Sequence, residues 1–463
     1  MGEIAEVVGG GTPRTSDPTN FENGDIPWLT PADLSGYTEK YISHGARFIT
    51  QKGIQSCAAR LLSAGTVLFT SRAPIGYVAI ARNPIATNQG FKSFVLQDGV
   101  LPEYVYWWLK GSKRRAESLA NGTTFLELSG ENAKKISIPI APLERQREIV
   151  AEIEKQFSHL DEAVANLQRV KANLKRYKAS VLKAAVEGRL VPTEAELAYR
   201  EGRDYETGGQ LVRRILEARL KQFGGRAKNR EPAETESADL PEVPDGWAWA
   251  SVDQLAAAEP NSITDGPFGS NLKSAHYRDA GPRVIRLQNI KDGEFADEYA
   301  HITQEHFDQL RKHQVHTGDL VIASLGDSPP RACVIPAFVG PAIVKADCIR
   351  FKPHPSVVSE YVNAALNCQP TRHRVKDVLH GIGRPRLSLG EIRAIALPLP
   401  PETEQYRIVA EVDRRLSIVR EVESEVDANL KRAQALRQAV LARAFAPPPT
   451  TGARQGERAV ATP

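Results

Sequence analysis

The run Asp327-Ser328-Pro329-Pro330-Arg331 comes nearer to a catalytic motif than any other stretch of this chain. Adenine methyltransferases place an aromatic residue after two prolines, and its ring stacks on the flipped base. Here Arg331 stands where the aromatic residue would be, and no strand, glycine-rich turn and helix for S-adenosylmethionine accompanies the run. We therefore predict no methyltransferase active site in this chain.

Residue spacing also argues against phosphate-transfer and metal chemistry. The chain has no G-x-x-x-x-G-K-[S/T] loop, and Asp265 to Ser270 contains a proline without a following helix pattern, so it is predicted to be a turn. His301, His306, His313 and His316 lie close in sequence, but their irregular spacing favours surface histidines over a metal site. The four cysteines are far apart, which predicts reduced, buried thiols and no zinc site.

Polar and basic side chains in short loops are the remaining candidates for chemistry. Base recognition in nucleic acid needs Arg, Lys, Asn, Gln, Ser or Thr on loops that can enter a groove. The candidates are Thr12, Arg14, Ser71, Arg72, Asn88, Gln89, Thr123, Asn271, Lys273, Ser324, Arg331, Arg384 and Arg386. Arg384 and Arg386 are the strongest because they flank a rigid proline beside glycines, and Arg72 is next. A solvated loop side chain is an equally good interpretation of any single candidate.

An internal repeat must position these loops, and its clearest part is a long helix. The sequence from Pro142 to Glu187 contains no Gly or Pro after its first residue, and a second copy begins at Pro401, 259 residues later, without a gap. A period this long exceeds a solenoid unit and indicates duplication of a complete module. The chain is therefore predicted to consist of two similar halves, each a globular region followed by a long helix.

Both predicted helices carry an apolar seam with a 3.5-residue period over five heptads, which is typical of a coiled coil. At ~1.5 Å per residue the seam is roughly 53 Å long, so it would act as a spacer. Ordinary amphipathic helices packed on their own domains are the alternative. The seam residues are Val150, Ile153, Phe157, Leu160, Val164, Leu167, Leu174, Val181, Val409, Val412, Leu416, Val419, Val426, Leu430 and Val440.

Charged residues interrupt the seam and suggest how the helices align. If the helices pair antiparallel with full overlap, Lys171 lies opposite Glu423. A buried ion pair there could select the antiparallel register. The alternative is that both side chains reach solvent at the edge of the seam.

The rest of the sequence consists of β-rich runs separated by turn residues. In the first half, Glu103 to Leu119 is predicted to be one helix, and Ile136 to Ile140 an edge strand because Pro139 cannot donate to a ladder. The opening segment Pro244 to Trp249 has no counterpart in the first half, so the first region is expected to lack its opening strand, either because translation begins upstream or because this domain is weakened. The predicted segments are 1–141 (first globular region), 142–190 (first long helix), 191–239 (connecting arm, helical and flexible), 240–400 (second globular region), 401–446 (second long helix) and 447–463 (disordered tail).

Composition sets wide limits on function. The chain has 463 residues, of which 41% are hydrophobic, with a net charge of +4 and a pI of 8.7. A mildly basic chain of this kind can bind nucleic acid but does not have to. No apolar run approaches the ~18 residues of a membrane span, and the N-terminus lacks a signal-peptide pattern. These features predict a cytoplasmic protein without a membrane partner.

At this point the motifs resemble a known family, the specificity (S) subunits of type I restriction–modification systems. The doubled P-L-x-x-Q-x-x-I-V signature after an I-x-I/L-P strand carries the resemblance, together with G-G-T-P at Gly10 to Pro13, an L-S pair before the strand, and E-G-R-L-V-P at Glu187 to Pro192. The resemblance covers nearly the whole chain. Two departures are the missing P-x-G-W opening in the first half and the missing leucine of the signature before Thr403-Glu404-Gln405.

The resemblance implies an α+β protein with a pseudo-two-fold internal repeat. Two target recognition domains would each read one half of a split, asymmetric site in double-stranded DNA, and the long helices would form an antiparallel coiled coil between them. The chain would be non-catalytic and would dock two methyltransferase (modification) subunits and restriction/translocase subunits. S-adenosylmethionine, ATP and Mg would be bound by those partners. A coiled-coil scaffold presenting two protein-binding domains is the alternative function.

Overall fold

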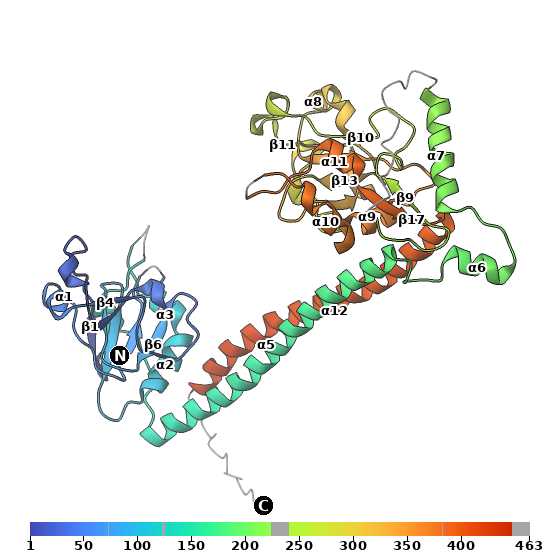
Figure 1. Ribbon diagram of the computed structural model, residues 1–463. Coiled ribbons are helices and arrows are strands. Elements are labelled where there is room, and N and C mark those ends of the chain that lie inside the picture. The colour runs from blue at the N-terminus through green and yellow to red at the C-terminus, as the bar shows by residue number, and fades with distance from the viewer. Residues whose placement is uncertain (73, 123–125, 224–239, 382, 447–463) are drawn as a thin grey trace, which may run out of the picture. The chain divides into compact units, whose positions relative to one another are not determined.

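The computed structural model describes residues 1–72, 74–122, 126–223, 240–381 and 383–446 (Figure 1). The chain forms two compact units: unit 1 contains residues 1–168 and the chain from 427 onward, and unit 2 contains residues 169–426. Each unit therefore combines one globular region with part of both long helices. The predicted flexible segment from 224 to 239 and the predicted disordered tail from 447 lie outside the described residues.

The globular part of unit 1 contains two sheets. Its strands are β1 (Ala5–Gly9), β2 (Ile26–Leu29), β3 (Tyr41–Ile42), β4 (Arg47–Ile49), β5 (Val67–Phe69), β6 (Val78–Ala81), β7 (Ala86–Thr87) and β8 (Lys92–Leu96). The larger sheet has the order β1-β8-β5-β6-β3 and the smaller one β4-β2-β7. Strands β5 and β6 are buried along their whole length, which explains why they read as unbroken apolar runs in the sequence.

Short helices pack around these sheets in unit 1. They are α1 (Gln51–Gln55), α2 (Pro102–Gly111), α3 (Lys113–Ser118) and α4 (Gly130–Lys134), with 3₁₀ turns η1 (Pro18–Asn20) and η2 (Pro31–Leu34). The single helix predicted over Glu103 to Leu119 is wrong at Ser112, where φ is −103° and ψ is 12°. Glycine and serine are weak helix formers, so Gly111 and Ser112 end α2, and the chain restarts as α3.

Unit 2 repeats this plan with one additional sheet. Its strands are β9 (Ala248–Ser251), β10 (Ile263–Thr264), β11 (Arg278–Ile285), β12 (Gln314–Val315), β13 (Leu320–Ala323), β14 (Arg331–Val334), β15 (Ala342–Val344), β16 (Cys348–Phe351) and β17 (Ala396–Leu399). The sheets have the orders β10-β16-β13-β14, β11-β15-β12 and β17-β9. The antiparallel β13 and β16 correspond to β5 and β8 of unit 1, and the parallel β11 and β15 to β2 and β7. Mixed helices and strands of this kind make the fold α+β.

The helices of unit 2 include an arm that follows the first long helix. The arm consists of α6 (Glu194–Glu201) and α7 (Gly208–Phe223), and the globular helices are α8 (Gln304–Gln309), α9 (Ser359–Asn367), α10 (Gln369–Arg374) and α11 (Leu389–Ala394). The 3₁₀ turns are η3 (Gly269–Asn271), η4 (Ser274–His276), η5 (Leu287–Asn289), η6 (Arg311–His313), η7 (Ala337–Val339) and η8 (Lys376–Val378). Leu211 and Ile215 of α7 are fully buried in the main core of unit 2, so this part of the arm is an integral part of the unit.

The predicted strand at Ile136 to Ile140 is wrong, and the repeat shows why. Its equivalent in unit 2 is β17, which forms a ladder with β9. No described segment of unit 1 corresponds to β9, and a strand forms only where its backbone groups find partners. Two side chains take over part of that pairing, because Trp108 Nε1 donates to Ser137 O (2.8 Å) and Tyr104 Oη donates to Pro139 O (2.7 Å).

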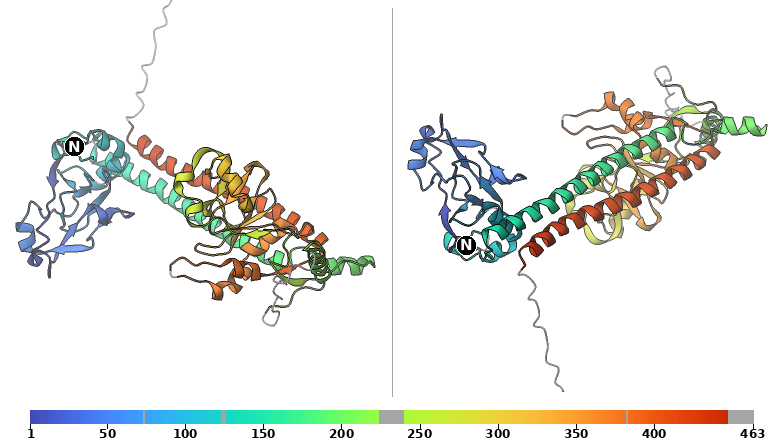
Figure 2. Two further views of the ribbon diagram at one scale, coloured as in Figure 1. Left: turned by 90° about the horizontal axis from the view of Figure 1, so that it is seen from above. Right: turned by 90° about the horizontal axis from the view of Figure 1, so that it is seen from below.

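The two long helices are α5 (Leu143–Val186) and α12 (Glu402–Ala444). In unit 1 the start of α5 packs on the end of α12, and Ile153, Phe157 and Leu441 share one apolar cluster. In unit 2 the end of α5 packs on the start of α12, with Val181 and Val412 in one core. Opposite ends meet within each unit, so the pairing in each is antiparallel (Figure 2). A continuous coiled coil along both helices stays a prediction.

Burial follows the predicted seam with one exception. Every seam position from Val150 to Ala444 is buried or half-buried, except Lys171, which is exposed. Its proposed partner Glu423 is half-buried. A partly solvated ion pair contributes little to stability. The hypothesis that a buried Lys171–Glu423 pair selects the register therefore loses its main energetic basis.

The glutamine of the repeated signature connects each long helix to its globular region. Gln146 is fully buried; its Oε1 accepts from the Leu101 amide (2.8 Å), and its Nε2 donates to Ala141 O (2.8 Å). Gln405 is buried in the same way, accepting from the Val358 amide (2.8 Å). Leu101 and Val358 precede the first turns of α2 and α9 and have no capping side chain of their own. Each glutamine thus satisfies an amide at a helix start that would otherwise be unpaired.

Replacing Gln146 with alanine is expected to lower the unfolding free energy by about 1–3 kcal/mol, because the Leu101 amide and the Ala141 carbonyl lose their partner. Urea unfolding of the full chain, followed by hydrogen exchange in α2, measures this effect. Gln168→Ala, an exposed glutamine on the same helix, is the matched control and is expected to cost less than about 0.5 kcal/mol. Equal costs for the two variants would contradict the role assigned to Gln146.

A buried polar network fastens the arm to the start of α12. Glu404 accepts from the Glu194 amide (2.8 Å) and from Trp247 Nε1 (3.0 Å), and burial raises the pKa of its carboxyl group. Burial alone would also raise the pKa of Glu194, but hydrogen bonds from Arg407 and Arg203 hold it below its ordinary value. The network satisfies two carboxylates that would be costly to bury alone.

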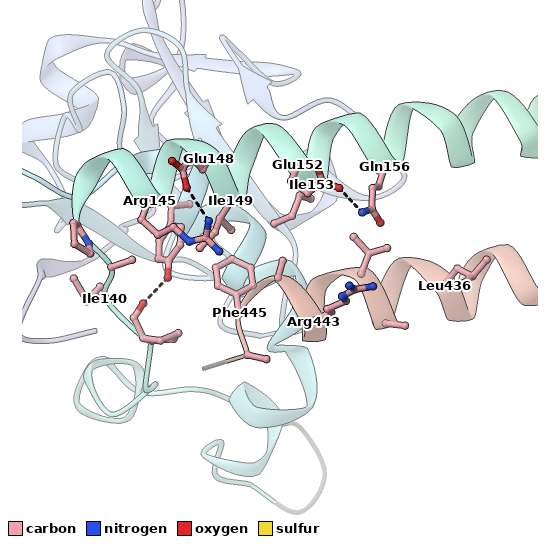
Figure 3. A pocket seen from close by; sticks show the side chains of 18 residues that line it. Ile140, Arg145, Glu148, Ile149, Glu152, Ile153, Gln156, Leu436, Arg443 and Phe445 are labelled. Carbon is pink, nitrogen blue, oxygen red and sulfur yellow. Dashed lines mark hydrogen bonds and ion pairs between the residues drawn. The ribbon is translucent and has the colours of Figure 1, made fainter. Parts of the chain in front are cut away.

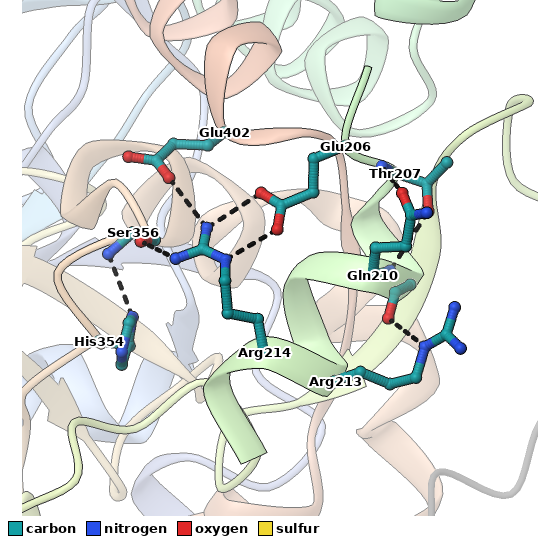
Figure 4. Close-up of polar contacts among 9 residues, drawn as sticks. Glu206, Thr207, Gln210, Arg213, Arg214, His354, Ser356 and Glu402 are labelled. Atoms are coloured by element: carbon teal, nitrogen blue, oxygen red, sulfur yellow. Dashed lines mark hydrogen bonds and ion pairs between the residues drawn. The ribbon is translucent and has the colours of Figure 1, made fainter. Parts of the chain in front are cut away.

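A second contact holds the other helix of the arm. Arg214 of α7 donates to both carboxylate oxygens of Glu206 (2.7 and 2.9 Å), lies 3.4 Å from Glu402 at the start of α12, and donates to Ser356 Oγ (3.0 Å) (Figure 4). A guanidinium shared in this way connects the arm, the long helix and the globular region of unit 2.

Candidate nucleic-acid interface

The loops predicted to read nucleic acid come together in unit 1. We call residues 70–72, 88–90, 121–122 and 126–128 the first loop cluster. The Ser71 amide donates to Gly90 O (2.8 Å), and Ser71 O accepts from the Leu128 amide (2.8 Å). Asn121 and Glu127 exchange both of their backbone hydrogen bonds (3.0 and 2.9 Å). Backbone bonds therefore join three loops that lie far apart in the sequence.

Unit 2 has the same bonds at the equivalent positions. We call residues 323–325, 345–347, 380–381 and 383–387 the second loop cluster. The Ser324 amide donates to Asp347 O (3.0 Å), Ser324 O accepts from the Leu387 amide (2.8 Å), and His380 and Arg386 exchange both backbone bonds (3.0 and 2.8 Å). The two clusters thus have one backbone arrangement but carry different side chains.

A close approach of two backbones explains a glycine that packs against each cluster. A Cβ atom on Gly10 would lie 2.0 Å from Asn88 O, and one on Gly266 would lie 2.3 Å from Lys345 O. Both distances are far below van der Waals contact, so only glycine fits. These glycines belong to the G-G-T-P turn of the first half and to the Asp265–Ser270 segment of the second.

Each cluster contains an arginine beside a carboxylate. In the first, Arg72 Nη1 lies 3.7 Å from Glu127 Oε2; in the second, Arg386 Nη2 lies 2.8 Å from Asp347 Oδ1. Arg72 lies in the loop that follows β5, whereas Arg386 lies on the hairpin in which His380 and Arg386 are paired. The two arginines therefore occupy different positions of the shared backbone arrangement. Lys92 lies beside the first pair; burial lowers its pKa, Glu127 raises it and Arg72 lowers it further.

The second cluster also borders a cavity of about 240 Å³. Its apolar lining comes from Phe268, Ile349, Leu387 and Leu389. Arg386 and Asp347 contribute charged groups. The cavity therefore places a polar edge next to an apolar wall, as a binding site for a flat, polar group would.

Most of the predicted residues of unit 1 gather at the first loop cluster. Thr12 donates to Gln89, and Asn88 Oδ1 accepts from the Gly90 amide (2.9 Å). Arg14 follows the same turn and is exposed. Ser71 is fully buried, so in this structure its part is to hold the backbone arrangement. Thr123 lies outside the described residues.

The predicted residues of unit 2 divide into two groups. Ser324, Arg331, Arg384 and Arg386 lie on two hairpins that the Gly326 amide joins by donating to Pro385 O (3.2 Å). Ser324 is buried, like Ser71. The remaining two lie elsewhere: Asn271 ends the turn η3, and Lys273 directly precedes the turn η4. His306 Nε2, on α8, donates to Asn271 O (2.8 Å).

Sequence reasoning missed the carboxylates of the two clusters. Glu127 and Asp347 are isolated acidic residues, separated from their arginines by 55 and 39 positions, and nothing local marks them. The repeat does mark Asp347 as a candidate, because Asp347 occupies the position that Gly90 has in the first half. This correspondence is found only when the two halves are aligned by their shared backbone hydrogen bonds.

Metal sites and membrane-spanning helices are two further kinds of functional feature. Within residues 1–72, 74–122, 126–223, 240–381 and 383–446, no group of three or more His, Cys, Asp or Glu side chains is placed to hold a metal ion. In the same described part of the chain, no helix is long and apolar enough to cross a membrane. All four cysteines are free, and Cys333, Cys348 and Cys368 are buried.

Unit 1 also has an open groove of about 1370 Å³ between the start of α5 and the end of α12 (Figure 3). Arg145 and Glu148 line it and form an ion pair (2.7 Å). In unit 2 the equivalent positions are Glu404 and Arg407, which hold the arm. The charges are thus exchanged between the units, and no arm covers the groove of unit 1 in the described residues.

The fold is an α+β fold with an internal repeat, and each unit carries one loop cluster and part of both long helices. Comparison with known proteins agrees: residues 1–176 match the family described as type I restriction modification DNA specificity domain. Residues 1–176 therefore carry a domain of the type I restriction–modification specificity family, the family that the motifs resemble.

Individual relatives are similar to this chain over segments of different length. The MjaIX specificity subunit of Methanocaldococcus jannaschii is 45% identical over 167 residues, which is 35% of this chain and 37% of that protein. The EcoDI specificity subunit of Escherichia coli is 23% identical over 354 residues, covering 74% and 69%. A structure from work on complex assembly and conformational transition of the type I R-M system matches 96% of each chain with a TM-score of 0.61 at 17% identity, which supports the fold.

Proposed function

We propose that this chain is the DNA sequence-specificity subunit of a type I restriction–modification complex and that it binds a bipartite, asymmetric site in double-stranded DNA. The observation that carries the proposal is the pair of loop clusters. Each has the same backbone hydrogen bonds, and each presents different polar and charged side chains. A constant scaffold with variable side chains is what two readers of different base sequences require.

The proposal includes partner subunits. Two methyltransferase subunits would dock on the long helices, and restriction/translocase subunits would join them. The open groove of unit 1 supports a docking surface because it combines apolar side chains with the Arg145–Glu148 pair. The chain itself is non-catalytic in this proposal, so S-adenosylmethionine, ATP and Mg²⁺ are bound by the partners.

Exchanging residues 240–400 for the same region of another specificity subunit is expected to change one half of the recognised site and leave the other half unchanged. Each cluster lies within a single unit, and therefore neither half-site depends on the other cluster. The test coexpresses the chimera with the methyltransferase subunits and maps methylated adenines in a bacterial host. A change in both halves would contradict the two-reader proposal.

A protein-binding scaffold is the competing function, and the same system separates the two. The unmodified complex is expected to retain a defined split motif from randomised duplex DNA. Retention that is independent of sequence, or absent, would instead favour the scaffold.

A further inference from the structure

We infer that Arg386 and Arg72 are the guanine-reading residues of the two half-sites, each positioned by its neighbouring carboxylate. This assignment rests on the proposed function and identifies one base contact in each half. The ligand group is the O6/N7 edge of a guanine in the major groove of duplex DNA, which an arginine fork contacts bidentately.

The backbone of Arg386 is hydrogen-bonded although its side chain is exposed. It exchanges two hydrogen bonds with His380 and follows Pro385, whose ring restricts the chain. The side chain of Arg386 is 48% exposed, so the residue is anchored by its backbone while its side chain remains accessible. An arginine prepared in this way loses less conformational entropy on binding than a free one.

The Arg386–Asp347 contact leaves the donors of the arginine available. Nη2 lies 2.8 Å from Asp347 Oδ1, yet this buried oxygen accepts no hydrogen bond from any residue that the structure describes. Asp347 therefore holds the guanidinium through charge, and no N–H bond of Arg386 is directed at its Oδ1. Asp347 is itself fixed, because its backbone oxygen accepts from both the amide and the Oγ of Ser324 (3.0 and 3.1 Å).

Charge decides between a base and a phosphate as the target. An arginine that binds phosphate gains from its full positive charge, whereas an arginine paired with a carboxylate is close to neutral as a pair. Arg386–Asp347 and Arg72–Glu127 are both such pairs. They retain directional donors with little net attraction for the DNA backbone, which suits sequence reading better than general affinity.

The two pairs are arranged differently, and this fits an asymmetric site. Arg72 follows the strand β5 and its carboxylate is on the hairpin, whereas Arg386 is on the hairpin and its carboxylate precedes β16. Because the backbone arrangement is shared, the two guanidinium groups lie at different places within it. The guanines that they read are therefore expected at different positions in the two half-sites.

The test uses the full chain in complex with its methyltransferase subunits. Binding is measured on the duplex motif that the unmodified complex enriches from a random pool, and on every single base-pair substitution of that motif. Arg386→Ala is expected to remove discrimination at one G·C pair, a loss of about 5- to 140-fold, which corresponds to ~1–3 kcal/mol. Arg72→Ala is expected to do the same at one pair in the other half. Discrimination retained elsewhere in the motif shows that each variant is folded.

Asp347 is a positioning residue, and its test follows from that role. Asp347→Asn is expected to weaken discrimination at the same base pair as Arg386→Ala, and the double variant should be no worse there than Arg386→Ala alone. Arg200→Ala, which removes an exposed arginine of the arm, is the charge-matched control and should leave every position unchanged.

Either of two results would contradict the guanine-reading assignment without contradicting the proposed function. One is full discrimination by Arg386→Ala at every base pair, and the other is a uniform loss of affinity for all duplexes, as a phosphate contact would give. If the unmodified complex enriches no motif at all, the proposed function fails and the assignment fails with it. The outcomes are distinguishable because the unmodified complex is measured first.

Discussion

Replacing Trp247 with alanine is expected to lower the unfolding free energy of unit 2 by about 3–5 kcal/mol, the usual cost of removing a large buried ring. Trp247 is 7% exposed, and its ring meets Tyr361 edge-on at 6.4 Å. Its Nε1 also donates to Glu404, whose pKa burial already raises. The substitution therefore leaves both a cavity and a buried carboxylate with one donor fewer.

Urea unfolding gives the size of this effect, and hydrogen exchange in α6 and at the start of α12 gives its location. Trp249→Ala is the matched control, because this half-buried tryptophan lies two residues away and donates to Pro241 O instead (2.9 Å). Trp247→Phe, which preserves most of the ring but removes the donor, is expected to fall between the two. A Trp247→Ala variant as stable as Trp249→Ala would refute the role of the network.

Phe157→Ala is expected to have an effect of the same size in unit 1, about 3–5 kcal/mol. Phe157 is a seam residue of α5, 8% exposed, and its ring meets Trp107 of α2 edge-on at 4.9 Å. It also lies 5.4 Å from the guanidinium of Arg437 on α12. One side chain thus connects the globular region of unit 1 to both long helices.

The measurement is again urea unfolding with hydrogen exchange, here in α2 and in the last turns of α12. Tyr177→Ala, an exposed aromatic residue of the same helix, is the control and should change stability by less than about 1 kcal/mol. Normal protection of α2 in Phe157→Ala would mean that the seam residue does not support the globular region.

The sequence predicted the regular parts of the fold well because their signals are periodic. The seam residues of α5 and α12 are the less exposed side of both helices, as a 3.5-residue period requires. The two secondary-structure predictions that failed depend on a single residue in one case and on a missing partner strand in the other. Ser112 ends a helix that the apolar pattern would continue, and residues 136–140 form no strand because no described segment of unit 1 corresponds to β9.

For the candidate site, the sequence indicated which loops to examine but not how they combine. Thr12, Arg72, Asn88 and Gln89 are polar residues at turns, and a turn pattern is a local property. Their assembly with the hairpin at Asn121 and Glu127 depends on backbone bonds between distant segments.

The duplication, the two long helices and their apolar seam were determined by the sequence alone, because residues close in sequence repeat at fixed intervals. The pairing of each arginine with a carboxylate was decided only by the tertiary structure. Glu127 is 55 residues from Arg72, and Asp347 is 39 residues from Arg386. Contacts across such separations arise when sheets and hairpins pack together, and no local pattern of residues records them.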